Sequence, residues 1–124
     1  MEGRTTHTRS GSVTLREDGI LCFRAASGVE HDEDKAIENI AALRQLARGM
    51  LLPVLVDMRE TGAMTRAARQ AYANADSAAQ GLLVGSSFTR IIANVFLRIG
   101  RPGQPAKMFT SEEEAVQWLN GFLT

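Results

Sequence analysis

Residues 32–57 read DEDKAIENIAALRQLARGMLLPVLVD, and a change of periodicity within this stretch decides the fold. In its first part apolar side chains recur at steps of three or four, which predicts an amphipathic helix over residues 32–48. The expected inner stripe of this helix is Ile37, Ile40, Leu43, Ala47 and Met50. Gly49 supplies the left-handed stop, and the β-rich run over residues 51–56, with Pro53 near its start, then predicts a strand.

Upstream of this helix the sequence predicts a β-hairpin. Val13 and Leu15 precede a turn that contains the Asp18-Gly19 pair, and residues 20–23 follow it. Asp-Gly between two apolar runs is the strongest local hairpin signal. The second run is apolar on both faces, as in a central strand. Residues 1–11 are polar and lack periodicity, so we expect a flexible lead-in before one domain over residues 12–124.

Downstream, strand-type and helix-type segments alternate. Thr65 is placed to cap a helix over residues 66–76, and a Thr-Ser-Glu-Glu capping box at residues 110–113 opens the last helix. Between these two helices we expect a strand at residues 81–84, a helix at residues 87–99 and a strand at residues 107–109. The order ββαβαβαβα predicts an α/β fold with a mixed, mostly parallel sheet of four to five strands and about four helices.

Composition excludes several classes of protein. The chain has 124 residues, of which 44% are hydrophobic and 23% charged, as in globular domains rather than disordered ones. Its 14 basic and 14 acidic residues cancel, which argues against a nucleic-acid binder. Neither a signal peptide nor an apolar run of about 20 residues is found. We therefore expect a cytoplasmic protein without stable membrane insertion.

Residues with reactive side chains form no catalytic or metal-binding pattern. His7 lies in the expected lead-in, and His31 lies among acidic residues at a helix start. Cys22 lies inside an apolar strand, where a thiol packs as a small hydrophobe. The acidic runs at residues 30–34 and 112–114 suit the positive ends of helix dipoles. The sequence thus predicts no catalytic residue, no metal site and no cofactor.

A candidate binding edge lies where strands give way to the helices expected over residues 66–76 and 87–99. Helix starts leave backbone N–H groups free, and in a parallel sheet the starts of these two helices fall on the same edge. Residues 58–110 hold seven basic and two acidic side chains, which adds a positive bias. The alternative is ordinary helix capping with solvated arginines. The expected ligand- or partner-binding residues are Thr65, Arg66, Arg69, Ser86, Ser87 and Arg90.

The helix expected over residues 87–99 is apolar around a wide arc. Its apolar residues are Ile91, Ile92, Val95, Phe96, Leu97 and Ile99. Two explanations stay open. Another subunit or a lipid-like ligand covers part of this surface, or the helix is buried wholly against its own sheet.

Three motifs resemble those of a known superfamily. They are Pro-Val-Leu-Val-Asp-Met-Arg at residues 53–59, Leu-Leu-Val-Gly-Ser-Ser at residues 82–87, and Phe-Thr-Ser-Glu-Glu-Glu-Ala-Val-Gln-Trp-Leu at residues 109–119. The ordered set resembles the STAS (anti-sigma-factor antagonist-like) superfamily, and more closely an uncharacterised bacterial STAS/SEC14-like group. The resemblance implies a four- to five-stranded sheet and a binding or regulatory role. Thr65-Arg66 stands where the antagonists carry a phosphorylated Asp-Ser pair, so the sequence departs from that switch.

Three functions compete at this point. The leading hypothesis is a non-enzymatic STAS-like interaction or regulatory module, a homodimer that meets a regulatory protein partner at the candidate edge. The alternative is a carrier or sensor of a small anionic or lipid-like ligand. An enzyme with Ser86 or Ser87 as nucleophile is the third, but a serine nucleophile needs a base within hydrogen-bond reach, and no histidine is placed to serve.

Overall fold

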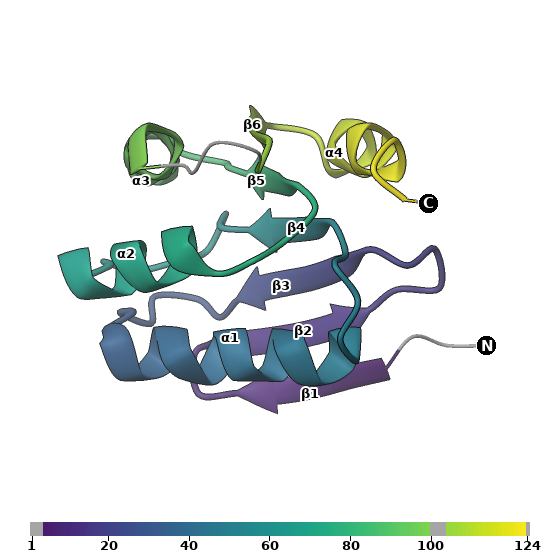
Figure 1. The fold of residues 1–124 in the computed structure, drawn as a ribbon. Coiled ribbons are helices and arrows are strands. Elements are labelled where there is room, and N and C mark those ends of the chain that lie inside the picture. Colours follow the sequence, from purple (N-terminus) through teal and green to yellow (C-terminus); the bar gives the residue numbers. More distant parts are fainter. Residues whose placement is uncertain (1–3, 100–103, 124) are drawn as a thin grey trace.

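The computed structural model describes residues 4–99 and 104–123, which form one six-stranded sheet and four helices (Figure 1). The strands are β1 Arg4–Thr8, β2 Gly11–Leu15, β3 Leu21–Ala25, β4 Val54–Asp57, β5 Gln80–Leu83 and β6 Ala106–Phe109. The helices are α1 Glu33–Ala47, α2 Arg66–Asn74, α3 Ser87–Ile99 and α4 Glu112–Asn120. None of the described helices is long and apolar enough to cross a membrane.

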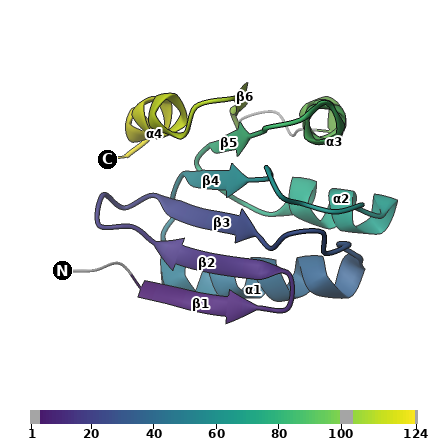
Figure 2. The same ribbon diagram turned by 180° about the vertical axis from the view of Figure 1, so that it is seen from behind.

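The strands lie side by side in the order of the chain. β1, β2 and β3 pair antiparallel, whereas β3, β4, β5 and β6 pair parallel. Crossovers between parallel strands are almost always right-handed, so a sheet that grows in one direction receives its crossover helices on one face. Accordingly α1 and α2 lie in front of the sheet in Figure 1 and behind it in Figure 2. The last helix, α4, packs on the opposite face.

Side-chain alternation along β3 and β4 supplies both faces of the core. Leu21 and Phe23 point to the face under α1, while Cys22 points to the face under α4. On β4, Leu55 joins the α4 cluster and Val54 the α1 cluster. A further cluster lies between β5 and the pair α2 and α3. The sheet is therefore buried on both faces at its centre.

The predicted α/β fold, its opening hairpin and its four helices are confirmed. Asp32 caps α1 and accepts a hydrogen bond from the Lys35 N–H at 2.9 Å. The helix ends in left-handed backbone at Arg48 (φ 51°) and Gly49 (φ 80°). Thr65 caps α2, and Ser111 caps α4. These ends could be placed because each cap satisfies a backbone group that the helix leaves free.

The structure adds one strand to the predicted order, which becomes βββαβαβαβα. Within the expected lead-in, Arg4–Thr8 forms β1 and pairs antiparallel with β2. Its residues are almost all exposed, so the strand shows no alternation of apolar and polar side chains. The backbone ladder to β2 and a hydrogen bond between the Thr5 and Thr14 hydroxyls (3.0 Å) hold it instead. Residues 1–3 and 124 lie outside the described part of the chain.

The inner stripe predicted for α1 is corrected at two positions. Ile37 is 54% exposed and Met50, just beyond the helix, is 64% exposed. The buried positions are Ala36, Asn39, Ile40, Ala42 and Leu46, so the helix is rotated toward β1 and β2 relative to the prediction. Asn39 lies on this buried side, where its amide donates a hydrogen bond to Ser10 Oγ and accepts one from Thr8 Oγ1.

Candidate functional site

The predicted edge residues lie at the starts of α2 and α3, but the structure links the two groups through no hydrogen bond or ion pair among the described residues. Thr65 Oγ1 accepts the Ala68 N–H at 3.1 Å. Ser86 Oγ accepts the Thr89 N–H at 3.1 Å, and Thr89 Oγ1 in turn accepts the N–H groups of Gly85 and Ser86. Capping thus already occupies polar groups that the sequence suggested for an anion.

The arginines of this edge divide into two kinds. Arg66 and Arg90 are exposed, as is Ser87. Arg69 is half-buried and turns back, so that its Nη1 donates to the Met64 carbonyl at 2.6 Å. Arg101, which contributed to the positive bias, lies outside the described residues. The edge remains a predicted surface rather than an assembled site.

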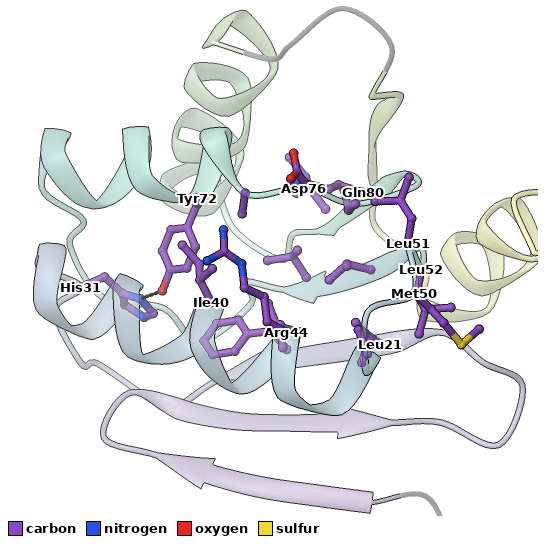
Figure 3. Close-up of a pocket in the computed structure, with 18 of the residues that line it drawn as sticks. Leu21, His31, Ile40, Arg44, Met50, Leu51, Leu52, Tyr72, Asp76 and Gln80 are labelled. Atoms are coloured by element: carbon purple, nitrogen blue, oxygen red, sulfur yellow. Dashed lines mark hydrogen bonds between the residues drawn. The ribbon is translucent and has the colours of Figure 1, made fainter.

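A cavity of about 380 Å³ lies elsewhere, between α1, α2 and the sheet (Figure 3). Its floor is built from every second residue of three parallel strands, namely Leu21, Phe23, Val54, Val56, Gln80 and Leu82. Ile40, Leu43, Arg44 and Ala47 of α1 form one wall, and Tyr72 of α2 with Ala75 and Asp76 forms the other. Small side chains at Ala47 and Ala75 leave space between the two helices. No sequence pattern predicts this cavity.

One end of the cavity is fixed by two chain segments that run beside each other past the ends of β3 and β4. The Gly62 N–H donates to the Val29 carbonyl at 3.1 Å, and the His31 N–H donates to the Ala63 carbonyl at 2.8 Å. A side chain at Gly62 would place its Cβ 2.8 Å from the Val29 carbonyl oxygen, so only glycine permits this approach. The pairing brings His31, Thr61 and Met64 to the cavity.

His31 belongs to a chain of buried hydrogen bonds at that end. Its Nδ1 lies 2.8 Å from Tyr72 Oη, which also accepts a hydrogen bond from Asn39 Nδ2 at 2.7 Å. Asn39 donates as well to Ser10 Oγ (2.7 Å) and accepts from Thr8 Oγ1 (2.6 Å). The network therefore connects the hairpin formed by β1 and β2 with α1 and α2.

Burial keeps the two titratable members of this network neutral. Desolvation lowers the pKa of His31, and the nearby Lys35 ammonium lowers it further against an opposing effect of Asp32. Desolvation also raises the pKa of Tyr72 to about 12, although the hydrogen bond from Asn39 opposes this. At neutral pH the network is a set of uncharged dipoles.

Three polar atoms of the cavity lining are buried without a hydrogen-bond partner in the part of the chain that the structure describes. They are His31 Nε2, Thr61 Oγ1 and Ser77 Oγ, in side chains of residues that are 0%, 7% and 4% exposed. A buried polar group without a partner costs about 1–3 kcal/mol. Among the described residues the only other such atom is Arg69 Nε, outside the cavity. Three of the four such atoms therefore belong to residues that line one cavity.

Two charged residues, Arg44 and Asp76, stand at the cavity and both are exposed. Figure 3 shows the Arg44 side chain rising from α1 toward the side of α2. Asp76 Oδ1 accepts a hydrogen bond from Gln104 Nε2 at 3.4 Å. Their opposite signs give the opening no net charge.

The opposite face of the sheet carries a separate ion cluster. Asp57 is buried and binds the guanidinium groups of Arg24 and Arg59, which also contact Glu112. Burial opposes ionisation of Asp57, but the hydrogen bonds from Arg59 and the charge of Arg24 outweigh it and lower the pKa of the carboxyl. Cys22 packs beside this cluster, buried as predicted, and desolvation raises its pKa. The described residues include no group of three side chains suited to a metal ion.

Comparisons with known proteins support the fold. A protein of the DUF3478 family with a SpoIIAA-like fold, from Shewanella loihica PV-4, is 15% identical, with a TM-score of 0.58 over 94% of this chain and 91% of that one. The SpoIIAA-like, or STAS-like, fold that the sequence motifs suggested is thereby confirmed.

A protein with unknown function from Arthrobacter sp. FB24 is 31% identical over 92% of this chain and 95% of that one, with a TM-score of 0.36. Among curated proteins none matches. Residues 14–123 match the model of a family described as a domain of unknown function, DUF7793.

Proposed function

The chain belongs to the DUF7793 family and has a SpoIIAA-like fold, and from its cavity we propose that it is a non-enzymatic module that binds a small, mostly apolar ligand. Of the two leading hypotheses from the sequence, the geometry supports the carrier or sensor best. The ligand site differs from the predicted edge, because the cavity lies between α1 and α2.

One observation carries this proposal. His31 Nε2, Thr61 Oγ1 and Ser77 Oγ lack partners among the described residues, although all three line a single cavity with a mostly apolar floor. Apolar walls with a few placed polar groups, in a volume of at least about 300 Å³, are typical of ligand pockets. A bound molecule would supply the missing hydrogen bonds and gain apolar contacts.

The same three atoms support a binding role rather than catalysis. A nucleophilic hydroxyl is normally activated by a hydrogen bond to its base. Within the described part of the chain, the hydroxyls of Thr61 and Ser77 and the free nitrogen of His31 have no hydrogen bond at all, so neither hydroxyl is paired with the imidazole. Their arrangement serves to recognise polar atoms of a ligand.

A matched pair of substitutions tests the proposal. Ala75→Phe places an aromatic ring in the cavity, whereas Ala67→Phe places one on the exposed side of α2. We expect the neutral fluorophore N-phenyl-1-naphthylamine to bind the unchanged protein and Ala67→Phe equally. Affinity should fall about tenfold or more in Ala75→Phe, since the ring takes up the space. Equal binding to all three proteins would place the fluorophore elsewhere and contradict the proposal.

The start of α3 favours a second candidate function, a surface for another protein chain. Phe88 (48% exposed) and Ile91 (64% exposed) are three residues apart and thus share a face of the helix, beside Arg90. We propose that a second copy of the chain covers this face in a homodimer. Sedimentation should show a dimer for the unchanged protein and a monomer for Ile91→Glu. A monomer in both cases would rule the homodimer out.

A further inference from the structure

The cavity lining also indicates the chemical nature of the ligand's polar group. This inference rests on the proposed binding function. We infer that the end of the cavity beside His31 and Thr61 takes an uncharged oxygen, such as the hydroxyl or carbonyl of an elongated apolar molecule, in preference to a carboxylate. Three features of the lining lead to this inference: the positions of its polar atoms, its charges, and the proton on His31.

The polar atoms without partners stand at opposite ends of the cavity floor. His31 and Thr61 follow the carboxyl ends of β3 and β4, whereas Ser77 precedes the amino end of β5. β4 runs parallel to both neighbours and has four residues, so its first and last Cα atoms are about 10 Å apart at the usual rise of about 3.3 Å per residue. Apart from Gln80, near the Ser77 end, the floor between them offers apolar side chains, which suits an extended hydrocarbon with a polar group at one end.

No buried charge among the described residues lines the cavity to balance an anion. The charged residues of the described lining are Arg44 and Asp76, which are exposed and of opposite sign. His31 is neutral, and its neighbours Lys35 and Asp32 contact each other at 3.6 Å outside the lining. A carboxylate drawn to this end would lose its water shell without meeting a cation, which is unfavourable.

The hydrogen bond between His31 and Tyr72 decides which nitrogen of His31 can donate to a ligand. Tyr72 Oη accepts a hydrogen bond from Asn39 Nδ2 and also carries one proton, and we assign that proton to the hydrogen bond with Nδ1 of His31. The second nitrogen, Nε2, then carries the proton of the neutral ring and can donate a hydrogen bond to a ligand. Thr61 Oγ1 can donate or accept beside it. Together these atoms complement a hydroxyl or carbonyl oxygen.

Two probes that differ only at the head group test this inference. At pH 8 we would measure how 1-decanol and decanoate displace N-phenyl-1-naphthylamine from the unchanged protein. We expect 1-decanol to bind at least about tenfold more tightly, because decanoate is ionised at this pH. Equal or tighter binding of decanoate would overturn the head-group inference while leaving the binding function intact. Failure of the fluorophore and both probes to bind would instead overturn the proposed function.

Two variants, Thr61→Val and His31→Phe, locate the head group within the cavity, and Ser87→Ala is their control. Thr61→Val keeps the shape of the side chain but removes the hydroxyl, and we expect it to weaken 1-decanol about fivefold, and by more than it weakens the fluorophore. Ser87→Ala removes an exposed hydroxyl outside the cavity and should change neither affinity. Unchanged binding of 1-decanol to both Thr61→Val and His31→Phe, with each variant folded, would contradict the assigned position.

Discussion

Nδ1 of His31 lies 2.8 Å from the phenolic oxygen of Tyr72, across 41 positions of sequence. This contact joins the loop before α1 to the last turn of α2, and the rings of both residues also pack near Phe23. A surface loop is thereby anchored in the interior. The cavity begins beside this contact, so its geometry and the stability of the domain depend on the same side chains.

Tyr72→Phe should destabilise the domain by about 1–3 kcal/mol, because it leaves Nδ1 of His31 and one N–H of Asn39 buried without their partner. Urea denaturation measures the difference. Gln70→Ala, at an exposed position of the same helix, should have little effect. A Tyr72→Phe protein as stable as the unchanged one would show that the phenol hydroxyl contributes nothing to the network.

Stability should fall as the pH is lowered below about 6.5 because of His31. Its pKa is lowered in the folded protein from the ordinary 6.5, so below that pH the unfolded chain binds the proton more readily. Denaturation between pH 5 and 8 should show this decline in the unchanged protein and in His7→Gln. His31→Gln should show a flatter profile over the same range. Identical profiles in His31→Gln and the unchanged protein would assign the decline to other groups.

Gly62→Ala should both destabilise the domain and weaken fluorophore binding. The added Cβ would lie 2.8 Å from the Val29 oxygen and 2.9 Å from the Gly28 oxygen, and these backbone atoms cannot move aside as a flexible side chain could. We expect a loss of about 1–3 kcal/mol in the free energy of unfolding, as for other overpacked sites. Gly85→Ala is the control, since its Cβ meets only the flexible Arg59 side chain. Equal behaviour of the two variants would contradict the close approach.

Asp57→Asn should destabilise the domain by about 2–3 kcal/mol without changing ligand binding. The buried carboxylate receives hydrogen bonds from Arg24 and Arg59, and its lowered pKa means that ionisation stabilises the fold above about pH 3.8. This contribution to stability is lost as the pH falls through the folded-state pKa. The stability of Asp57→Asn should therefore depend less on pH in this range. Acid denaturation with a fluorophore titration at pH 7 checks both statements, and weaker fluorophore binding would contradict the independence of the two faces.

Much of the fold could be predicted because local signals and packing agree. Thr65 is predicted to cap a helix and caps α2, whereas the capping box predicted at residues 110–113 lies one residue too early, because Ser111 caps α4. Strand β1 could not be predicted in this way, because its stability comes from pairing with β2 and its side chains carry no periodic pattern. Apolar and polar residues alternate in a strand when one of its faces is buried, and an exposed edge strand such as β1 has no buried face.

The cavity escaped prediction for a different reason. It requires that Ala47 at the end of α1 and Ala75 just beyond α2 line the same space over the sheet, and that residues 28–31 pair with residues 60–65. Neither relationship leaves a local pattern. A usable signal was Asn39, a polar residue at an inward position of an apolar stripe, because buried amides need partners. His31 was read only as part of an acidic helix start, although it is fully buried.

The hydrogen bonds of Asn39 couple the hairpin of β1 and β2 to the cavity, although β1 itself is mostly exposed. Two of the three side-chain partners of Asn39 are Thr8 and Ser10, and the third is Tyr72. A chain that began at Gly11 would lack Thr8 and Ser10, so Asn39 and its partner Tyr72 in the cavity wall would be held less firmly. By thermodynamic reciprocity, a ligand that steadies Tyr72 also tightens the attachment of β1. Protection of the β1 backbone from hydrogen exchange would thus report on occupancy of a cavity that β1 itself does not line.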